Sequence, residues 1–396
     1  MGAMVVMTGC SGSGSEDEGD RGPESTAGST APLELAAGED LYALADDFEP
    51  GEPGEVIAVQ EVAGDAALEG TVLRVLYHSE SLEGEDIAVS GAIIVPDGPA
   101  PSGGRPVLSW AHGTTGIADQ CAPSLDPSRA GPALAAPFLE RDMVFVATDY
   151  EGLGTPGRHP YIAGESEARG TLDIVRAARQ LSARTGASDR AVLWGHSQGG
   201  HAVLFANQVA REWAPELDVV GTVAGAPPSH LPLIADALRD SPYRFYLGMV
   251  AAGWSAAYPD ADLSLVLTPL GIELLAQVDE KCAGELAEAW SSHDYDELVS
   301  RDPNDVEPWA TLLVDNDPGF EVGASPVLII HGENDEQIPL ISSELLVDRM
   351  CGVGQTVHRR TYPGATHSGA IGASMSDMLE WIDARLAGTE APSDCA

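Results

Sequence analysis

The stretch that most constrains this chain is Ala191–Gly200, in which four apolar residues run directly into Gly-His-Ser-Gln-Gly-Gly. The apolar residues have the composition of a buried strand, and His201–Ala210 beyond the glycines has that of a helix. A serine at the apex of so sharp a turn occupies a sparsely populated backbone conformation that costs roughly 1–3 kcal/mol, and the flanking glycines leave the room it needs. The pattern therefore predicts a strand, a strained turn with Ser197 at its apex, and a helix whose positive end faces that serine.

Apolar runs on both sides of this turn predict the rest of a sheet. Alternating segments near the start predict antiparallel strands at Glu55–Val62, Thr71–His78 and Ile87–Val95. Runs separated by helical stretches predict strands at Pro106–Ala111, Met143–Thr148, Ala191–Trp194, Val219–Ala224, Pro326–Ile330 and Thr356–Tyr362. One of the intervening helices is expected at Asp173–Leu181. Together these runs predict an α/β fold with a mainly parallel sheet and helices on both faces.

The chain divides by composition into five segments. With 396 residues, of which 44% are hydrophobic, it is long enough for one large α/β domain with an insertion. The strand rhythm breaks after residue 227, where helical and proline-rich segments predict a helical insertion above the sheet. The expected segments are the end of a lipoprotein signal at 1–10, a disordered acidic linker at 11–37, the first part of the core at 38–227, the helical lid at 228–320 and the second part of the core at 321–396.

The first ten residues resemble the end of a bacterial lipoprotein signal. They are mainly apolar and end in Thr8-Gly9-Cys10, which places small residues before a cysteine as in a lipobox. A stretch rich in serine and glycine follows and suits a flexible tether, although no Lys or Arg precedes the apolar run. Lipidation of Cys10 and an extracytoplasmic location, at the cell surface or secreted, are therefore expected.

The charge of the chain argues against two classes of partner. There are 62 acidic residues and 20 basic ones, so the formal net charge is −42, and Lys281 is the only lysine. A surface this acidic repels the phosphates of nucleic acids and of anionic lipids, so neither is expected to bind. Membrane contact is expected only through the N-terminal lipid anchor. The preference for arginine over lysine fits a GC-rich genome, and the acidity also fits adaptation to salt.

Two other motifs are weak candidates for a cofactor or metal site. Gly152–Gly157 satisfies the dinucleotide-binding pattern Gly-x-Gly-x-x-Gly, but Pro156 and Pro160 oppose a helix where the phosphates would bind. Asp315–Gly319 is similar to a calcium loop, but its glycine comes one position early and the closing glutamate is absent. No cluster of cysteine and histidine has the spacing of a zinc site. We therefore expect neither a cofactor nor a resident metal ion.

Ser197 is a candidate nucleophile, which needs a base to take its proton and an acid to orient that base. With a strand–turn–helix of this kind, the expected chain order is serine, acid and histidine, each at the carboxyl end of a strand. The loop after the strand at Pro326–Ile330 contains Asp335, which is the expected acid by its place between a glycine and a proline. Glu333 and Glu336 are the competing acids.

The expected base is His367, which follows the last predicted strand and lies at the head of the last helix. Two other histidines compete with it. His358 lies within the last strand, and His331 precedes a glycine at the end of another strand. Neither lies on a loop where it could face the serine, so His367 is preferred.

The oxyanion of a tetrahedral intermediate needs N–H donors that are already in place. One donor is expected to be the backbone N–H of Gln198, directly after the serine. The other is expected to be Thr114, in the loop His112–Gly116 after an early strand, with Gly113 as the second choice. The side chain of His112 is expected to fix that loop.

With these residues, the chain resembles the α/β-hydrolases and, more closely, the secretory lipase family of the fungal lipase A type. The resemblance covers roughly residues 41–395. It rests on the turn at Ser197, the helical insertion, the spacing from Asp335 to His367, Asp149–Gly154 after a strand and Cys121–Ser124 after the oxyanion loop. It implies the α/β-hydrolase fold and hydrolysis of carboxylic esters by these three residues as a triad. The chain departs from the family pattern in the His-Gly-Thr-Thr of its oxyanion loop and in the glutamine after the serine.

The resemblance also implies a disulfide pairing. Apart from Cys10, four cysteines remain, and an exported protein could join them in three ways. The resemblance selects Cys121 with Cys282, which would tie the insertion to the oxyanion side. It also selects Cys351 with Cys395, which would pin the C-terminus beside the last strand.

Three functions compete. The first is a secreted or cell-surface serine carboxylic ester hydrolase, a lipase or esterase that acts on neutral esters through an acyl-enzyme. The second is a serine peptidase of the same fold, and the third is a cell-surface binding protein with an inactive site. Nucleophile, acid, base and oxyanion loop are all present, and no clear acidic pair would dock a free amino terminus, so the ester hydrolase is favoured. The apolar stretch Tyr243–Trp254 forms either the core of the lid or an acyl channel beneath it.

Overall fold

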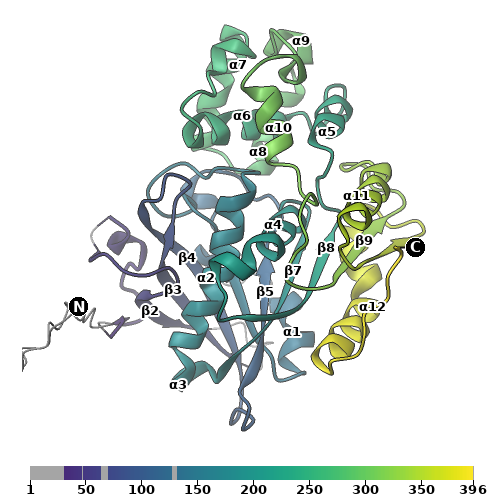
Figure 1. Ribbon diagram of the computed structural model, residues 1–396. Helices are drawn as coiled ribbons and strands as arrows, with labels where there is room; N and C mark the ends of the chain where they lie inside the picture. Colours follow the sequence, from purple (N-terminus) through teal and green to yellow (C-terminus); the bar gives the residue numbers. More distant parts are fainter. Residues whose placement is uncertain (1–30, 47, 64–69, 127–131, 396) are drawn as a thin grey trace, which may run out of the picture. The chain divides into compact units, whose positions relative to one another are not determined.

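A ten-stranded sheet forms the centre of the described residues, with the strand order β1-β2-β3-β4-β6-β5-β7-β8-β9-β10 (Figure 1). The structure is a computed structural model that describes residues 31–46, 48–63, 70–126 and 132–395. The strands are β1 Leu33–Leu35, β2 Val56–Val62, β3 Gly70–Glu80, β4 Asp86–Pro96, β5 Arg105–Ala111, β6 Val144–Thr148, β7 Ala187–His196, β8 Asp218–Gly225, β9 Val327–Gly332 and β10 Val357–Tyr362. Every predicted strand is present, most of them longer than predicted.

The sheet combines an antiparallel part and a parallel part. Strands β2, β3 and β4 pair antiparallel, and β4 also pairs antiparallel with β6. From β6 through β5, β7, β8 and β9 to β10 every pair is parallel. Strands β6 and β9 are buried along their whole length, which is why the sequence shows them as continuous apolar runs.

Helices cover both faces of this sheet (Figure 1). They are α1 Pro132–Leu139, α2 Gly164–Gln180, α3 Ser182–Thr185, α4 Gln198–Trp213, α11 Leu340–Val353 and α12 Gly369–Leu386. On one face α2, α4 and α11 bury Leu172, Val203 and Leu346 in a common apolar core with the sheet. On the other face α1 and α12 bury Phe138 and Met378 in a second core.

Between β8 and β9 the chain leaves the sheet and forms a group of helices (Figure 1). They are α5 Leu231–Leu238, α6 Phe245–Ala257, α7 Pro269–Leu275, α8 Ala283–Ser291, α9 Tyr295–Leu298 and α10 Trp309–Asp315. Short 3-10 helices lie at Tyr42–Leu44, Asp119–Cys121, Pro123–Leu125, Leu263–Leu265, Ala276–Asp279 and Pro303–Asp305. Trp254, Trp290 and Trp309 are buried in an apolar cluster that also contains Tyr161 and Ile162, so the helices of the insertion pack on the segment before α2.

The folded unit begins earlier than composition predicts. The linker predicted at 11–37 is wrong at its end, because Leu33–Leu35 is a strand that pairs in parallel with β2 and belongs to the compact unit Pro32–Ala396. The side-chain amide of Gln60 donates hydrogen bonds to the carbonyl oxygens of Ala36 (2.9 Å) and Glu39 (2.8 Å). These main-chain partners order a segment that has few apolar residues. The signal end predicted around Cys10, and the linker as far as residue 30, lie outside the described residues.

The helix before β7 also begins earlier than predicted, at Gly164 instead of Asp173. Its first turns contain Glu167 and Arg169, which the sequence suggests are exposed. Both side chains are buried, and Glu167 is fully inaccessible to solvent. Contacts with other elements, which periodicity does not reveal, place these polar residues inside.

Two disulfides close long loops of the chain. Cys121 pairs with Cys282, 161 residues away, and Cys351 pairs with Cys395, 44 residues away. These are the pairs that the family resemblance implies. Gly116, in the loop after β5, also forms an isolated β-bridge with Cys282. The first disulfide therefore ties the helical insertion to the loop that follows β5.

Removal of either disulfide should lower the free energy of unfolding, because each cross-link restricts the unfolded chain. On the chain-entropy model, replacing Cys121 and Cys282 by alanine costs up to about 5 kcal/mol, and replacing Cys351 and Cys395 costs up to about 4 kcal/mol. Equilibrium unfolding in guanidinium chloride measures both losses. Peptide mapping of the non-reduced protein identifies the pairs, and free thiols or a crossed pairing would contradict this assignment.

Candidate active site

Ser197 stands at the turn from β7 to α4 in a strained backbone conformation. Its φ is 59° and its ψ is −124°, and its N–H donates a hydrogen bond to the carbonyl oxygen of Gly225 (2.8 Å). A Cβ at Gly199 would overlap the carbonyl oxygen of Ala111, and a Cβ at Gly195 would overlap that of Gly199. Only glycine fits at both positions, so the turn Gly195–Gly199, the elbow, can form as the sequence predicts.

The start of α4 leaves backbone donors free beside the serine. The first helical hydrogen bond runs from the N–H of His201 to the carbonyl oxygen of Ser197 (3.1 Å). The N–H of Gln198 therefore lies outside the helical ladder, as expected for the first turn of a helix. The positive end of the helix dipole is at the same place. This N–H has the properties that an oxyanion donor requires.

The loop after β5 lies against the elbow. A Cβ at Gly113 would be 3.6 Å from the Cβ of Ser197 and 3.2 Å from the carbonyl oxygen of His196. The next residue, Thr114, shares a hydrogen bond between its hydroxyl and that of Tyr161 (2.7 Å). The predicted oxyanion loop and the predicted nucleophile are therefore neighbours, although no hydrogen bond of the described residues identifies the second donor.

A histidine–carboxylate pair lies beside the elbow. Nδ1 of His367 is 2.7 Å from Oδ2 of Asp335, and both side chains are buried. The backbone N–H groups of Gln337 (2.9 Å) and Ile338 (2.8 Å) donate to the other oxygen of Asp335. Glu336 accepts the backbone N–H of His367 (3.1 Å) and not its ring, so the structure favours Asp335 over this competitor.

A second histidine supports the same aspartate. Nε2 of His331 is 3.2 Å from Oδ2 of Asp335, and both side chains are fully buried. Burial raises the pKa of Asp335, but the hydrogen bonds from His331 and His367 outweigh it and hold this pKa well below its usual range. The sequence did not lead us to expect this contact of His331. The spacing of four residues between His331 and Asp335 at the end of a strand was the signal that could have indicated it.

The ring of His196, the residue before Ser197, lies against the imidazole of His367. The two rings meet edge to face with their centroids 4.6 Å apart. Burial, together with the electrostatic influence of the His367 imidazole, lowers the pKa of His196 to about 3, so the ring of His196 stays neutral. The elbow after β7, Asp335 after β9 and His367 after β10 thus meet at the carboxyl edge of the sheet.

Ser197 lines an apolar cavity beneath the helical insertion. The cavity is lined by Tyr161, Ile162, Ser197, Pro228, Leu231, Ile234, Ala235, Leu238, Tyr246, Leu247, Val250, Trp254, Leu313 and Ile338. A second apolar cavity lies within the insertion and shares the wall residues Ala235, Leu247, Val250, Trp254 and Leu313 with the first. The two cavities therefore adjoin at these residues.

The competing motifs have structural roles. Gly152–Gly157 is a loop, and α2 begins only at Gly164, so no helix starts where a dinucleotide would need one. Asn316 and Asp317 are occupied by protein partners, since they accept hydrogen bonds from the N–H groups of Gly164 and His230 respectively. Within the described residues, no group of three or more His, Cys, Asp or Glu could hold a metal ion. No helix in this part of the chain is long and apolar enough to cross a membrane.

A strained serine, a histidine–aspartate pair and a free helix N-terminus at the carboxyl edge of a mainly parallel sheet define a serine hydrolase with the α/β-hydrolase fold. A sequence profile of the secretory lipase family matches residues 130–394. The chain belongs to this family. It is a carboxylic ester hydrolase of the lipase or esterase type, and it acts outside the cytoplasm.

Individual proteins agree with the family profile. The chain is 27% identical to the secreted triacylglycerol lipase LIP4 of Malassezia globosa over 70% of its own length and 65% of that protein. It is 26% identical to a probable inactive lipase of Mycobacterium tuberculosis over 89% of its length and 83% of that protein. Its structure is similar to that of Candida antarctica lipase A, with a TM-score of 0.76 and 23% identity over 87% of this chain and 84% of that one. At this identity the structural likeness concerns the fold.

Replacement of Ser197 or His367 by alanine should lower kcat by about four or more orders of magnitude, because nucleophile and base act as a unit. His358→Ala is the matched control. His358 lies on β10 and its ring pairs with Asp394 (2.9 Å), so it takes no part in the His367–Asp335 pair and activity should be retained. Hydrolysis of a nitrophenyl ester measures all three variants. A fully active His367→Ala enzyme would disprove the assignment of the base.

Proposed function

We propose that Ser197, Asp335 and His367 form a catalytic triad that hydrolyses neutral carboxylic esters through an acyl-enzyme. The observation that carries this proposal is the serine at the floor of an apolar cavity, with the buried His367–Asp335 pair (2.7 Å) beside it. Asp335 accepts the Nδ1–H of His367, which leaves Nε2 free to take the proton of the serine hydroxyl. The low pKa of Asp335 keeps it charged and able to stabilise the imidazolium that forms.

The reaction then follows from these positions. The serine oxygen attacks the ester carbonyl carbon, and the N–H groups of Gln198 and Thr114 stabilise the negative charge on the carbonyl oxygen. His367 returns its proton to the alkoxide that leaves, and the acyl group stays on Ser197. Water, deprotonated by His367, attacks the acyl-enzyme, and His367 passes this proton to the oxygen of Ser197 as the bond to the acyl group breaks and the carboxylic acid leaves.

We also propose that residues 228–320 act as a lid whose underside binds the acyl chain. The cavity at Ser197 is lined almost entirely by apolar side chains, and it adjoins a second apolar cavity inside the insertion. Ligand sites of this kind accept apolar groups and use few polar groups for orientation. The net charge of −42 disfavours anionic substrates, so neutral lipid esters are the proposed class.

Catalytic efficiency should rise from acetyl to butyryl and octanoyl nitrophenyl esters. Each methylene buried in the channel contributes up to about 0.8 kcal/mol, or about fourfold in kcat/KM. Leu247→Trp should remove the gain for octanoate and leave acetate hydrolysis nearly unchanged, because Leu247 lies where the two cavities adjoin. Leu247→Ala, the matched control, should keep the preference for longer chains.

An aminoacyl nitroanilide in the same assay separates this function from its alternative. A serine peptidase would cleave the anilide, whereas the proposed enzyme cleaves only the esters. Best activity on acetate, with longer chains rejected, would mean that the lid residues pack only on one another.

We further propose that Cys10 carries lipid and anchors the protein outside the cytoplasmic membrane. The small residues before Cys10 and the polar stretch after it support this proposal. The wild-type protein, expressed with its authentic start, should partition with membranes, and Cys10→Ala should be released in soluble form. Fractionation followed by mass spectrometry of the N-terminal peptide measures both. Membrane retention of Cys10→Ala would contradict the proposal.

A further inference from the structure

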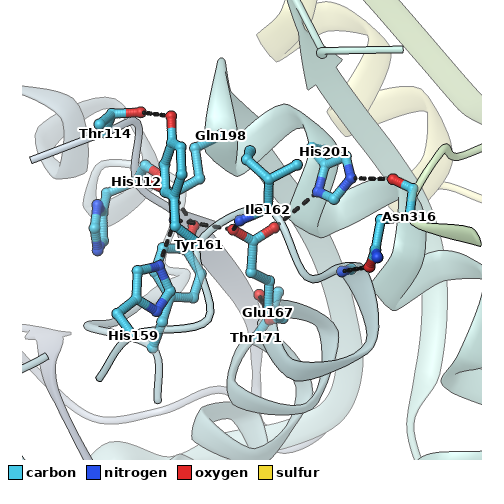
Figure 2. Close-up of polar contacts among 12 residues, drawn as sticks. His112, Thr114, His159, Tyr161, Ile162, Glu167, Thr171, Gln198, His201 and Asn316 are labelled. Atoms are coloured by element: carbon cyan, nitrogen blue, oxygen red, sulfur yellow. Dashed lines mark hydrogen bonds and ion pairs between the residues drawn. The ribbon is translucent and has the colours of Figure 1, made fainter. Parts of the chain in front are cut away.

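Glu167 is a fully buried carboxyl group that has no part in the triad. It lies in the first turn of α2, and its side chain and that of His201 are completely inaccessible to solvent. Figure 2 shows Glu167 between α4 and the segment that contains Tyr161 and Ile162. A buried carboxyl group is costly unless its oxygens are hydrogen-bonded, and both oxygens of Glu167 have partners.

One oxygen of Glu167 holds the cavity wall and the elbow together. Oε1 accepts the backbone N–H of Ile162 (3.0 Å) and the side-chain N–H of Gln198 (2.9 Å). Ile162 lines the cavity of Ser197 and has a φ of 59°, which is unusual for a β-branched residue. Such a conformation persists only where its surroundings hold it. The same oxygen therefore fixes a strained wall residue and the residue after the nucleophile.

His159 fixes the orientation of the Gln198 amide. Nδ1 of His159 is 2.8 Å from the carbonyl oxygen of Glu151, which can only accept, so Nδ1 carries the hydrogen. Nε2 of His159 is then an acceptor, and the amide nitrogen of Gln198 donates to it (2.8 Å). Burial lowers the pKa of His159 to about 4, so the ring stays neutral and continues to accept. If the amide of Gln198 were flipped, its oxygen would face Nε2 of His159 and Oε1 of Glu167, which both accept hydrogen bonds.

The other oxygen of Glu167 shares a proton with His201. His201 lies on α4, as Gln198 does. Nε2 of His201 donates to the carbonyl oxygen of Asn316 (2.8 Å), so this nitrogen carries a hydrogen. Nδ1 is 2.8 Å from Oε2 of Glu167, and a second proton must lie between these two atoms. A glutamine at position 167 could supply that proton from its amide and accept the Ile162 and Gln198 hydrogens with its oxygen.

We propose that Glu167 is a positioning residue of the active site. By holding the side chain of Gln198, it keeps the first residue of α4, and therefore the backbone N–H aimed at the oxyanion, in register with the cavity wall at Ile162. This inference rests on the proposed ester hydrolysis at Ser197. Donors to an oxyanion act because they are in place before the charge develops, and displacement of a reacting group by about 1 Å can lower the rate about 100-fold.

The test compares Glu167→Ala with Glu167→Gln. Active sites are counted with a nitrophenyl phosphonate, kcat and KM are measured with nitrophenyl butyrate, and an alkyl boronic acid reports affinity for a tetrahedral adduct on Ser197. Glu167→Ala should lose about 100-fold in kcat with little change in KM, and the boronic acid should bind more weakly by a similar factor. Glu167→Gln should keep both values within about threefold, because it can satisfy every hydrogen bond.

Asp173→Ala and Asp173→Asn are the matched controls. Asp173 is equally buried on the same helix, but its partners are Ser79, Arg176 and Trp213, away from the elbow. Thermal unfolding should show a loss of stability for both alanine variants, whereas kcat and boronic acid affinity should fall only for Glu167→Ala. If Glu167→Ala does not fold, Gln198→Met replaces it in the test. This substitution removes the hydrogen bond between the side chains of residues 198 and 167 but keeps the backbone N–H of residue 198. Its kcat should fall about tenfold or more.

Three outcomes would overturn the inference. They are an unchanged kcat in Glu167→Ala or in Gln198→Met, an equal loss in Asp173→Ala, and a Glu167→Gln enzyme as poor as the alanine variant. A wild-type enzyme that reacts with the phosphonate but hydrolyses no ester would instead refute the proposed function, so the two failures are distinct.

Discussion

The strained backbone of Ser197 is the constraint on which the rest of the structure depends. Local interactions do not stabilise a serine with a φ of 59° and a ψ of −124°. Neighbouring elements must therefore hold Ser197 in this conformation. Strand β7 and helix α4 do so only because Gly195 and Gly199 let backbone atoms of the elbow and of β5 come into direct contact. The same close packing turns the first N–H groups of α4 toward the serine. The backbone strain, the proposed nucleophile and its proposed oxyanion donor therefore have a single structural cause.

Two histidines near the candidate nucleophile are neutral, in a chain whose formal net charge is −42. Burial keeps His159 and His196 neutral, with pKa values lowered to about 4 and about 3. Asp335 remains charged because His331 and His367 both hydrogen-bond to it. A buried carboxylate with two such partners can orient an imidazole over a wide range of pH.

The helical insertion is joined to the elements that carry the site. Asn316, at the end of α10, accepts hydrogen bonds from the backbone N–H of Gly164 (3.0 Å) and from the hydroxyl of Tyr258 (3.1 Å), and its carbonyl oxygen accepts from His201. On the opposite side Cys282 is bonded to Cys121. These attachments join the insertion to α2, to α4 and to the segment after β5.

The sequence by itself determined the features that depend on local chemistry: the strand, glycines and serine of the elbow, the apolar strands of a parallel sheet, and an acid and a histidine after the strands that should carry them. Tertiary structure decided what depends on contacts between distant segments. The strand at Leu33–Leu35 is ordered by partners on β2, His331 reaches Asp335, and Glu167 is buried although it lies in a polar stretch. Periodicity reports which residues avoid water, but a buried polar side chain is chosen by hydrogen-bond partners far away in the chain, and these exist only after the chain has folded.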